Sequence, residues 1–309
     1  MNTSQSLSLK NQGLTALPEF VAEQVGLEAL DADLNRLAAL PEWIGRLRRL
    51  QSLSLYSNQL SGLPDSLWQL TGLRVLNVAD NRLTTLAPGL GQLAQLEMLD
   101  LGHNALAALP ATIGALARLR FCYLSDNGLS ELPPSITNLR SLIYLNVSAN
   151  RLRALPEDLG NLGALVELRV ANNRLAALPA SIGQLGKLRE LHAQFNQITA
   201  LPGEIGGLGQ LRKLMLQDNR LASLPASIGD LRSLTDLDLR NNILTALPVT
   251  LGNLKNLRFL DLRANRLAAI PDWLGELSRL EKLDLRWNSL AAIPPWLEQL
   301  EQRGCTVFM

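Results

Sequence analysis

Few residues of the chain could do chemistry. Its 309 residues include only two histidines and two cysteines. His103 and His192 are almost four units of a 23-residue repeat apart, which corresponds to about 19 Å at the spacing of neighbouring strands. That separation is too large for a shared metal ion or proton relay. We therefore expect each histidine to stand alone, and the sequence predicts no metal site and no cofactor.

Aspartates offer the remaining route to acid–base chemistry. Asp236, Asp238 and Asp261 are spaced so that two carboxylates could pair across neighbouring strands. Two adjacent carboxylates can share a proton when burial raises one of their pKa values. These positions are predicted to lie on an open surface, so we expect no raised pKa. The chain also lacks a glycine-rich phosphate loop and a serine nucleophile elbow, and we predict that it is not an enzyme.

The elements that must position these residues are repeats. The pattern L-x-x-L-x-L-x-x-N-x-L recurs every 23 residues without insertion, and Gln12 takes the place of Asn in the first unit. Twelve asparagines mark the other units: Asn35, Asn58, Asn81, Asn104, Asn127, Asn150, Asn173, Asn196, Asn219, Asn242, Asn265 and Asn288. The chain is thus predicted to contain thirteen repeats.

Each repeat combines two periodicities. The Leu-x-Leu segment before the Asn alternates apolar and polar residues, which predicts one short parallel strand. The return path carries L-P-x-x-I/L-G-x-L, whose apolar spacing and proline predict the first turn of a short helix. We interpret the recurring Gly as a turn residue. A buried Asn amide would be costly without partners, so we expect it to bond backbone groups in its own and neighbouring repeats.

These motifs resemble the leucine-rich-repeat family over residues 6–309. The uninterrupted 23-residue unit is similar to the intracellular class of Ras-linked scaffolds, plant homologues and many bacterial proteins, including plant-pathogen effectors. The resemblance implies an α/β fold, a right-handed horseshoe solenoid with parallel strands on the concave face and short helical turns on the convex face. It also implies protein binding on the concave face, at positions such as Tyr123, Tyr144 and Arg169.

Composition restricts partners and compartment. The net charge of +1 gives no basic excess for nucleic acid, and an arginine stripe after the asparagines is interrupted by aspartates, which favours a role in solubility. No apolar stretch of membrane-spanning length and no secretory signal is visible. Cys122 takes an inward position, and Cys305 lies too far away to pair with it. We predict a cytoplasmic protein, with a secreted effector lacking a classical signal peptide as the alternative.

The repeats predict a single domain over 1–309. Its N-terminal edge at Ser6 to Leu9 is expected to be uncapped, with an open hydrophobic end that invites a homodimer. Residues 294–309 are expected to form a C-terminal capping segment, with a helix from Pro294 and a strand within Cys305 to Met309. No catalytic domain is expected beyond the repeats.

Once the folding positions are assigned, variation concentrates on the outward strand positions and the residue before each Asn. Aromatic, sulfur and basic side chains are enriched there, as they are in protein interfaces. The predicted partner-binding residues are Tyr56, Met98, Phe121, Tyr123, Tyr144, Arg169, His192, Phe195, Met215, Arg240, Arg263 and Trp287. The alternative interpretation is that such aromatics only pair across strands.

Three aspartate–arginine pairs recur two residues apart in the last units: Asp238 and Arg240, Asp261 and Arg263, and Asp284 and Arg286. We interpret them as a solvated ion-pair network, with a charged patch that orients a partner as the alternative.

The sequence thus predicts a non-catalytic protein-interaction scaffold. Self-association through a terminal edge, a pathogen-type effector or recognition module, and a receptor for a small ligand or glycan near Tyr144 and His192 are the alternatives.

Overall fold

The computed structural model describes residues 5–309; residues 1–4 of the predicted domain lie outside the described residues. Contacts within the chain form two compact units, Met1–Arg151 and Leu152–Met309, and each is described by itself. No helix within residues 5–309 is long and apolar enough to cross a membrane.

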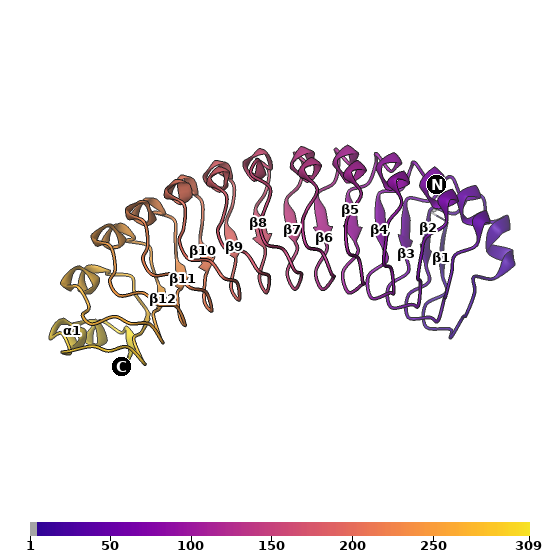
Figure 1. Ribbon diagram of the computed structural model, residues 1–309. Helices are drawn as coiled ribbons and strands as arrows, with labels where there is room; N and C mark the ends of the chain where they lie inside the picture. Colours follow the sequence, from indigo (N-terminus) through magenta and orange to yellow (C-terminus); the bar gives the residue numbers. More distant parts are fainter. Residues whose placement is uncertain (1–4) are drawn as a thin grey trace. The chain divides into compact units, whose positions relative to one another are not determined.

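Each repeat contributes one three-residue strand that pairs in parallel with the strands of adjacent repeats in its unit (Figure 1). In the first unit the strands are β1 (Ser6–Ser8), β2 (Ala29–Asp31), β3 (Ser52–Ser54), β4 (Val75–Asn77), β5 (Met98–Asp100), β6 (Phe121–Tyr123) and β7 (Tyr144–Asn146). In the second they are β8 (Glu167–Arg169), β9 (Glu190–His192), β10 (Lys213–Met215), β11 (Asp236–Asp238), β12 (Phe259–Asp261), β13 (Lys282–Asp284) and β14 (Thr306–Phe308).

The return paths form short 3-10 helices on the side opposite the strands (Figure 1). They are η1 (Glu19–Glu23), η2 (Glu42–Arg46), η3 (Asp65–Gln69), η4 (Pro88–Gln92), η5 (Ala111–Ala115), η6 (Pro134–Asn138), η7 (Leu159–Asn161), η8 (Ala180–Gln184), η9 (Gly203–Gly207), η10 (Ala226–Asp230), η11 (Val249–Asn253) and η12 (Asp272–Glu276). The predicted solenoid of parallel strands and short helical turns is confirmed.

Most of the recurring prolines lie just before the helix rather than in its first turn. Pro225 precedes η10 with a φ of −68° and an extended ψ, and its carbonyl accepts a hydrogen bond from the Ile228 N–H at 3.0 Å. The fixed φ of proline suits this entry, and no backbone donor is needed at that position. Proline therefore sets where most of these helices begin.

The recurring glycine permits close packing, and its interpretation as a turn residue was wrong. Gly114 lies inside η5, and a Cβ built on it would lie 2.5 Å from the carbonyl oxygen of Ser135 in the next repeat. Real Cβ atoms do not approach backbone this closely, so consecutive helices could not pack at this distance with a larger residue.

The asparagine column is hydrogen-bonded as predicted. Asn219 is 8% exposed. Its Nδ2 donates to the carbonyls of Ala193 at 3.0 Å and Leu216 at 3.0 Å, and its Oδ1 accepts the Ile198 N–H at 3.0 Å. The side chain thus joins its own repeat to the preceding one, and the backbone groups left free after each strand gain partners.

A second column has no counterpart in the sequence analysis. In every repeat the residue just before the Asn position has a positive φ, between 50° and 59°, although none of these residues is glycine. The set includes Leu34, Phe195 and Trp287. A left-handed conformation costs a residue with a Cβ roughly 1 kcal/mol, and more when the side chain is bulky.

The last repeat ends in a helix and a strand. Helix α1 (Trp296–Gln302) is followed by β14, which pairs with β13, so the helix and strand expected in 294–309 are present. Their role as a cap and the single-domain organisation stay predictions. At the other end Leu9 is buried, Leu7 is half-buried, and Ser6 and Ser8 are exposed; the uncapped edge expected at Ser6 to Leu9 stays a prediction.

Candidate functional site

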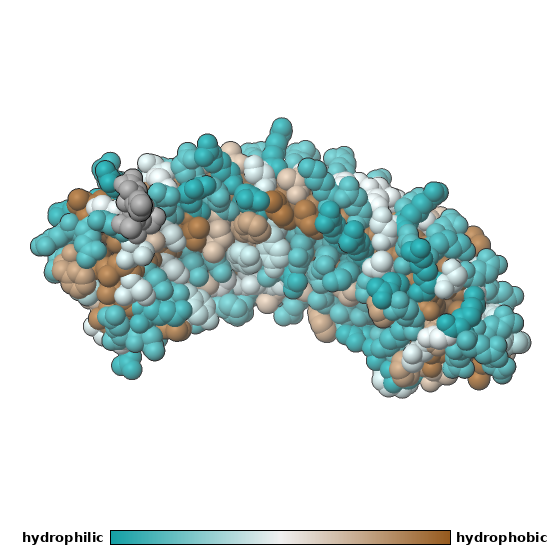
Figure 2. Space-filling view, turned by 180° about the vertical axis from the view of Figure 1, so that it is seen from behind, coloured by the Kyte–Doolittle hydropathy of each residue, from teal (hydrophilic) through white to brown (hydrophobic). Residues whose placement is uncertain are grey.

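In each unit we call one surface the strand face. It consists of the outward side chains of the strands and of the residues between each strand and the Asn position. The predicted partner-binding residues lie on it, in both units. Figure 2 shows one side of the molecule, on which hydrophilic residues predominate and hydrophobic residues form separate patches.

In the first unit the structure brings together an aromatic patch, made of Met98, Phe121, Tyr123 and Tyr144. Met98 pairs in register with Phe121, and Phe121 pairs with Tyr144. The rings of Tyr123 and Tyr144 are 4.9 Å apart between centroids and tilted by 38°. All four side chains are half-buried.

The remaining first-unit residue of the predicted set lies apart from this patch. Tyr56, three repeats before Tyr123, is 40% exposed, and its N–H donates to Oδ1 of Asp33 at 2.8 Å. It follows β3, whereas the aromatic patch belongs to β5, β6 and β7.

In the second unit β8, β9 and β10 carry a charged cluster, made of Glu167, Arg169, Glu190, His192 and Lys213. Arg169 Nε lies 2.5 Å from Glu167 Oε1, and Glu190 contacts both His192 Nε2 at 3.1 Å and Lys213 Nζ at 3.0 Å. Burial raises the pKa of Glu190, but hydrogen bonds from Lys213 and His192 outweigh it and leave the pKa lowered. The same hydrogen bond raises the pKa of Lys213.

The prediction that each histidine stands alone was wrong. His103 Nδ1 lies 2.7 Å from Asp126 Oδ2, and His192 is bonded to Glu190. One ligand atom each from Glu167, Glu190 and His192 lies within 4.8 Å of the others, a donor set that a divalent metal could use. Arg169 and Lys213 already compensate both carboxylates, so a metal ion would have to displace two ion pairs.

The aspartate–arginine pairs form the predicted network, but part of it is buried. Arg263 Nη2 lies 2.6 Å from Asp261 Oδ2, and Arg286 Nη2 lies 2.6 Å from Asp284 Oδ2. The Asp284 side chain is 0% exposed, so the network is not fully solvated as predicted. Each aspartate also accepts the backbone N–H two residues on, as Asp261 does from Arg263 at 3.1 Å. These carboxylates therefore help to end the strands.

Two large aromatic side chains border a hollow of about 480 Å³ at the loop edge of this unit. Phe195 is 51% exposed and Trp287 is 73% exposed, and both have the left-handed backbone conformation described above. The hollow is also lined by Arg240 and Arg263, so four of the predicted residues come together here. Asp218, Asn241 and Ala264 complete the lining.

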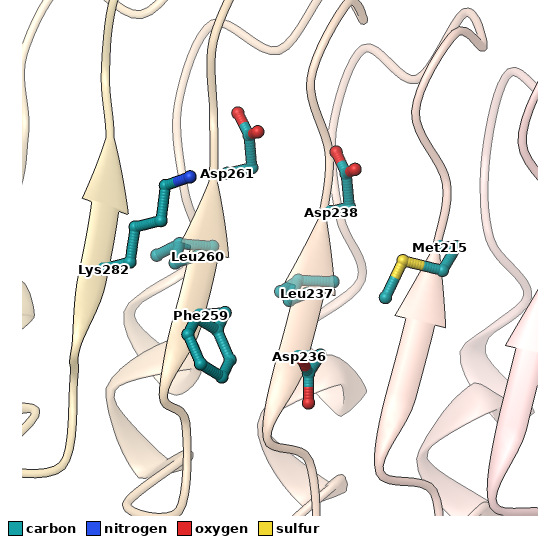
Figure 3. Close-up of a pocket in the computed structure, with 8 residues that line it drawn as sticks. All are labelled: Met215, Asp236, Leu237, Asp238, Phe259, Leu260, Asp261 and Lys282. Atoms are coloured by element: carbon teal, nitrogen blue, oxygen red, sulfur yellow. The ribbon is translucent and has the colours of Figure 1, made fainter. Parts of the chain in front are cut away.

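A smaller hollow of about 180 Å³ lies on the strands themselves and was missed in the sequence. It is lined by Met215, Asp236, Leu237, Asp238, Phe259, Leu260, Asp261 and Lys282 (Figure 3). Of these, only Met215 belongs to the predicted partner-binding set. The recurrence of aspartates at neighbouring strand positions was visible in the sequence, but their shared enclosure was not.

Burial in this hollow, together with the nearby Asp261 carboxylate, raises the pKa of Asp238 to about 6, although the Arg240 N–H and the Arg240 and Arg263 guanidiniums act to lower it. The expectation that no carboxylate of this surface has a raised pKa was therefore wrong. The physical reason is that side chains from neighbouring strands shield Asp238, whose side chain is 17% exposed.

Known proteins share the repeat. A family profile described as "Leucine-rich repeat region" matches residues 87–199 and 200–302, and one described as "Leucine rich repeat" matches residues 25–83. The chain belongs to the leucine-rich-repeat family. No curated protein matches it.

Solved leucine-rich-repeat structures resemble the chain over nearly its whole length. A leucine-rich-repeat protein of Leptospira interrogans is 30% identical, with 99% of this chain and 96% of that chain covered and a TM-score of 0.65. The ectodomain of the Arabidopsis thaliana receptor kinase GASSHO1/SCHENGEN3, solved with Casparian strip integrity factor 2, is 33% identical, with a TM-score of 0.74. TLR13, solved with ssRNA13, is 27% identical, with a TM-score of 0.78.

The extent of these matches differs. The match to GASSHO1/SCHENGEN3 covers 91% of this chain but only 38% of that chain. The match to TLR13 covers 98% of this chain but only 46% of that chain. Leucine-rich-repeat proteins of this kind thus include receptors in complexes with different classes of ligand.

Proposed function

We propose that this leucine-rich-repeat protein is a non-catalytic scaffold that binds a partner protein on its strand face, the face predicted to be concave. The aromatic patch is the observation that carries this proposal. Phe121, Tyr123 and Tyr144 lie on adjacent strands and point away from the leucine core, so a partner can bury them without unfolding the repeat. Half-exposed aromatic side chains of this kind dominate the energy of many protein interfaces.

Protein is the proposed partner rather than nucleic acid. The net charge is +1, and the cations of the charged cluster are already paired with carboxylates. A surface that follows phosphates needs unpaired cations, because its affinity comes from counterion release. Since TLR13 was solved with RNA, a gel-shift measurement with single-stranded RNA at two salt concentrations belongs to the test. Salt-sensitive RNA binding at submicromolar concentration would contradict the choice of protein.

The experiment compares baits in lysate of the organism that carries the gene. The wild-type chain and a Phe121→Ala/Tyr123→Ala/Tyr144→Ala variant are immobilised, and retained proteins are identified by mass spectrometry. We expect the wild-type bait to retain a partner protein that the variant bait does not retain. The affinity of the variant for that partner should be at least about 30-fold weaker than that of the wild type, which corresponds to ~2 kcal/mol.

A matched control removes three exposed apolar side chains elsewhere. Phe20, Val249 and Ile293 are 49%, 72% and 69% exposed and lie outside the strands. A Phe20→Ala/Val249→Ala/Ile293→Ala variant should retain the partner. Equal retention by all three baits would contradict the proposal, and so would a large loss of melting temperature in the aromatic variant, because the three residues would then be packing residues.

We also propose a cytoplasmic location. Cys122 and Cys305 are both free and buried, and burial raises the pKa of Cys122 to about 12, so neither is placed as an extracellular staple. Export without a classical signal peptide is the alternative, and relatives of this chain include a receptor ectodomain. Immunodetection in the cytoplasmic and secreted fractions of producing cells distinguishes the two locations.

A further inference from the structure

The hollow on β10 to β13 combines an apolar base with an excess of negative charge. Asp236 and Asp238 lie on β11, Phe259 and Asp261 lie on β12, and Met215 closes one side (Figure 3). The base includes Leu237 and Leu260, each 1% exposed. An enclosure with apolar walls and several carboxylates suits a group that has a hydrocarbon stem and a cationic end.

The three carboxylates differ in how well they are compensated. Asp261 is held by Arg263, with Nε at 3.0 Å from both carboxylate oxygens and Nη2 at 2.6 Å from one. Asp238 has Arg240 Nε only at 3.7 Å, and Asp236 accepts the Thr235 hydroxyl at 2.5 Å. Asp238 is therefore less well compensated than Asp261, whereas Asp236 also attracts Lys213 and Arg258.

One cation, Lys282, lines the hollow, and its side chain extends towards Asp261 (Figure 3). Lys282 Nζ lies 5.3 Å from the centroid of the Phe308 ring on β14, a cation–aromatic contact.

We propose that this hollow is a binding site for a lysine side chain of the partner protein, with the stem against the apolar base and the ammonium at Asp238. The raised pKa of Asp238 supports this assignment, because a bound ammonium would favour the charged carboxylate. Binding should therefore weaken when the pH falls below about 6. The inference rests on the proposed protein-binding function and names the chemistry of the partner.

The test uses a small probe and a local reporter. The protein is labelled with ¹³C at the methionine methyl groups, and the Met215 signal is assigned with a Met215→Leu variant. Nα-acetyl-lysine amide is titrated against Nα,Nε-diacetyl-lysine amide, which has the same stem without the charge. We expect a saturable shift of the Met215 signal with the first probe alone, while Met98 in the first unit stays unchanged.

Variants connect the shift to the hollow. Asp236→Asn/Asp238→Asn should weaken probe binding about fivefold or more, whereas Lys282→Gln should strengthen it, because it removes a competing cation. Asp230→Asn/Glu204→Gln removes two charges on the exposed helical side of the same unit and should bind as the wild type does. Thermal unfolding of each variant, compared with that of the wild type, shows that it is folded.

Several outcomes would overturn the proposal. They are equal shifts with the neutral probe, no saturable shift with the cationic probe, unchanged binding by Asp236→Asn/Asp238→Asn, or a Met215 response to calcium chloride with none to the lysine probe. The last result would identify a metal site instead. Because the probe needs no partner protein, failure here is distinguishable from failure of the bait experiment, which depends on the aromatic patch of the other unit.

Discussion

Arg263 places its Nε 3.2 Å from Oδ2 of Asp284, whose side chain is 0% exposed. The two residues belong to neighbouring repeats, and the same guanidinium also holds Asp261 of its own repeat. Asp284 pairs in register with Phe308 on β14, and the Arg286 guanidinium lies 4.8 Å from the Phe308 ring centroid. Beside the final strand the Asp284 side chain is thus more deeply buried than those of Asp238 and Asp261, each of which is 17% exposed.

Removing Arg263 should destabilise the second unit. The Arg263→Ala variant leaves Asp284 with Arg286 as its remaining ion-pair partner and Asp261 without its bidentate contact. An undercompensated buried carboxylate is costly, and we expect a loss of about 2–3 kcal/mol in the free energy of unfolding, measured by urea denaturation.

Arg240→Ala is the matched control, because Arg240 Nε lies 3.7 Å from Asp238 and its side chain is 38% exposed. We expect a loss below ~1 kcal/mol there. Equal losses in the two variants would show that burial of Asp284 adds nothing to the network.

Asn219→Ala should remove about 2–4 kcal/mol, since two carbonyls and one N–H lose partners together at a buried position. The comparison is Asn253→Ala on the exposed end of η11, where we expect a change within about 0.5 kcal/mol. Wild-type melting of Asn219→Ala in differential scanning calorimetry would refute the structural role of the asparagine column.

Asp238→Asn should stabilise the protein at neutral pH and not in acid. The folded-state pKa of Asp238 is about 6, against a usual value of 3.8, so between these values the folded state holds a proton that the unfolded state has lost. This group therefore supports folding below about pH 4, and that contribution is lost as the pH rises towards 6.

Asparagine keeps the acceptor for the Arg240 N–H and removes the charge. We expect a gain of ~1–2 kcal/mol at pH 7.5 that disappears at pH 4, measured by chemical denaturation at both pH values. A gain that persists unchanged in acid would show that titration of Asp238 is not its cause.

Ala264→Gly should be stabilising, because Ala264 has a φ of 50° and glycine adopts this region without steric cost. The expected gain is up to ~1 kcal/mol. Ala269, exposed and outside the positive-φ set, offers the control, since Ala269→Gly should lose up to ~1 kcal/mol through the entropy of the unfolded chain. Thermal unfolding of both variants measures the contrast; losses in both would mean that strain at Ala264 is negligible.

The sequence predicts the repeat well because its signals are local and periodic. Leu216 and Asn219 recur in the same positions of other units, so the strand, its inward side and the bonded amide all follow from spacing. The left-handed column carries a weaker signal: glycine is missing from it, although seven of its thirteen residues are Asn, Asp or His, which adopt this conformation more often than other residues with a Cβ.

The site is only partly predictable for a different reason. The outward direction of Tyr123 and Tyr144 follows from alternation, but their ring contact depends on the offset between β6 and β7. The raised pKa of Asp238 depends on what neighbouring strands place around it, and burial of Asp284 depends on β14. Such enclosure is a property of packed side chains from separate repeats.

The left-handed column has a consequence for anyone who would redesign this surface. Residues two and four positions before each Asn can be substituted with little strain in the backbone. A library of variants at these positions therefore changes the chemistry of the surface alone. One residue before the Asn, every choice also alters the folding energy, and β-branched residues are the least tolerated. Variants selected for binding at Phe195 or Trp287 should therefore be judged against their stability, because the same substitution changes both.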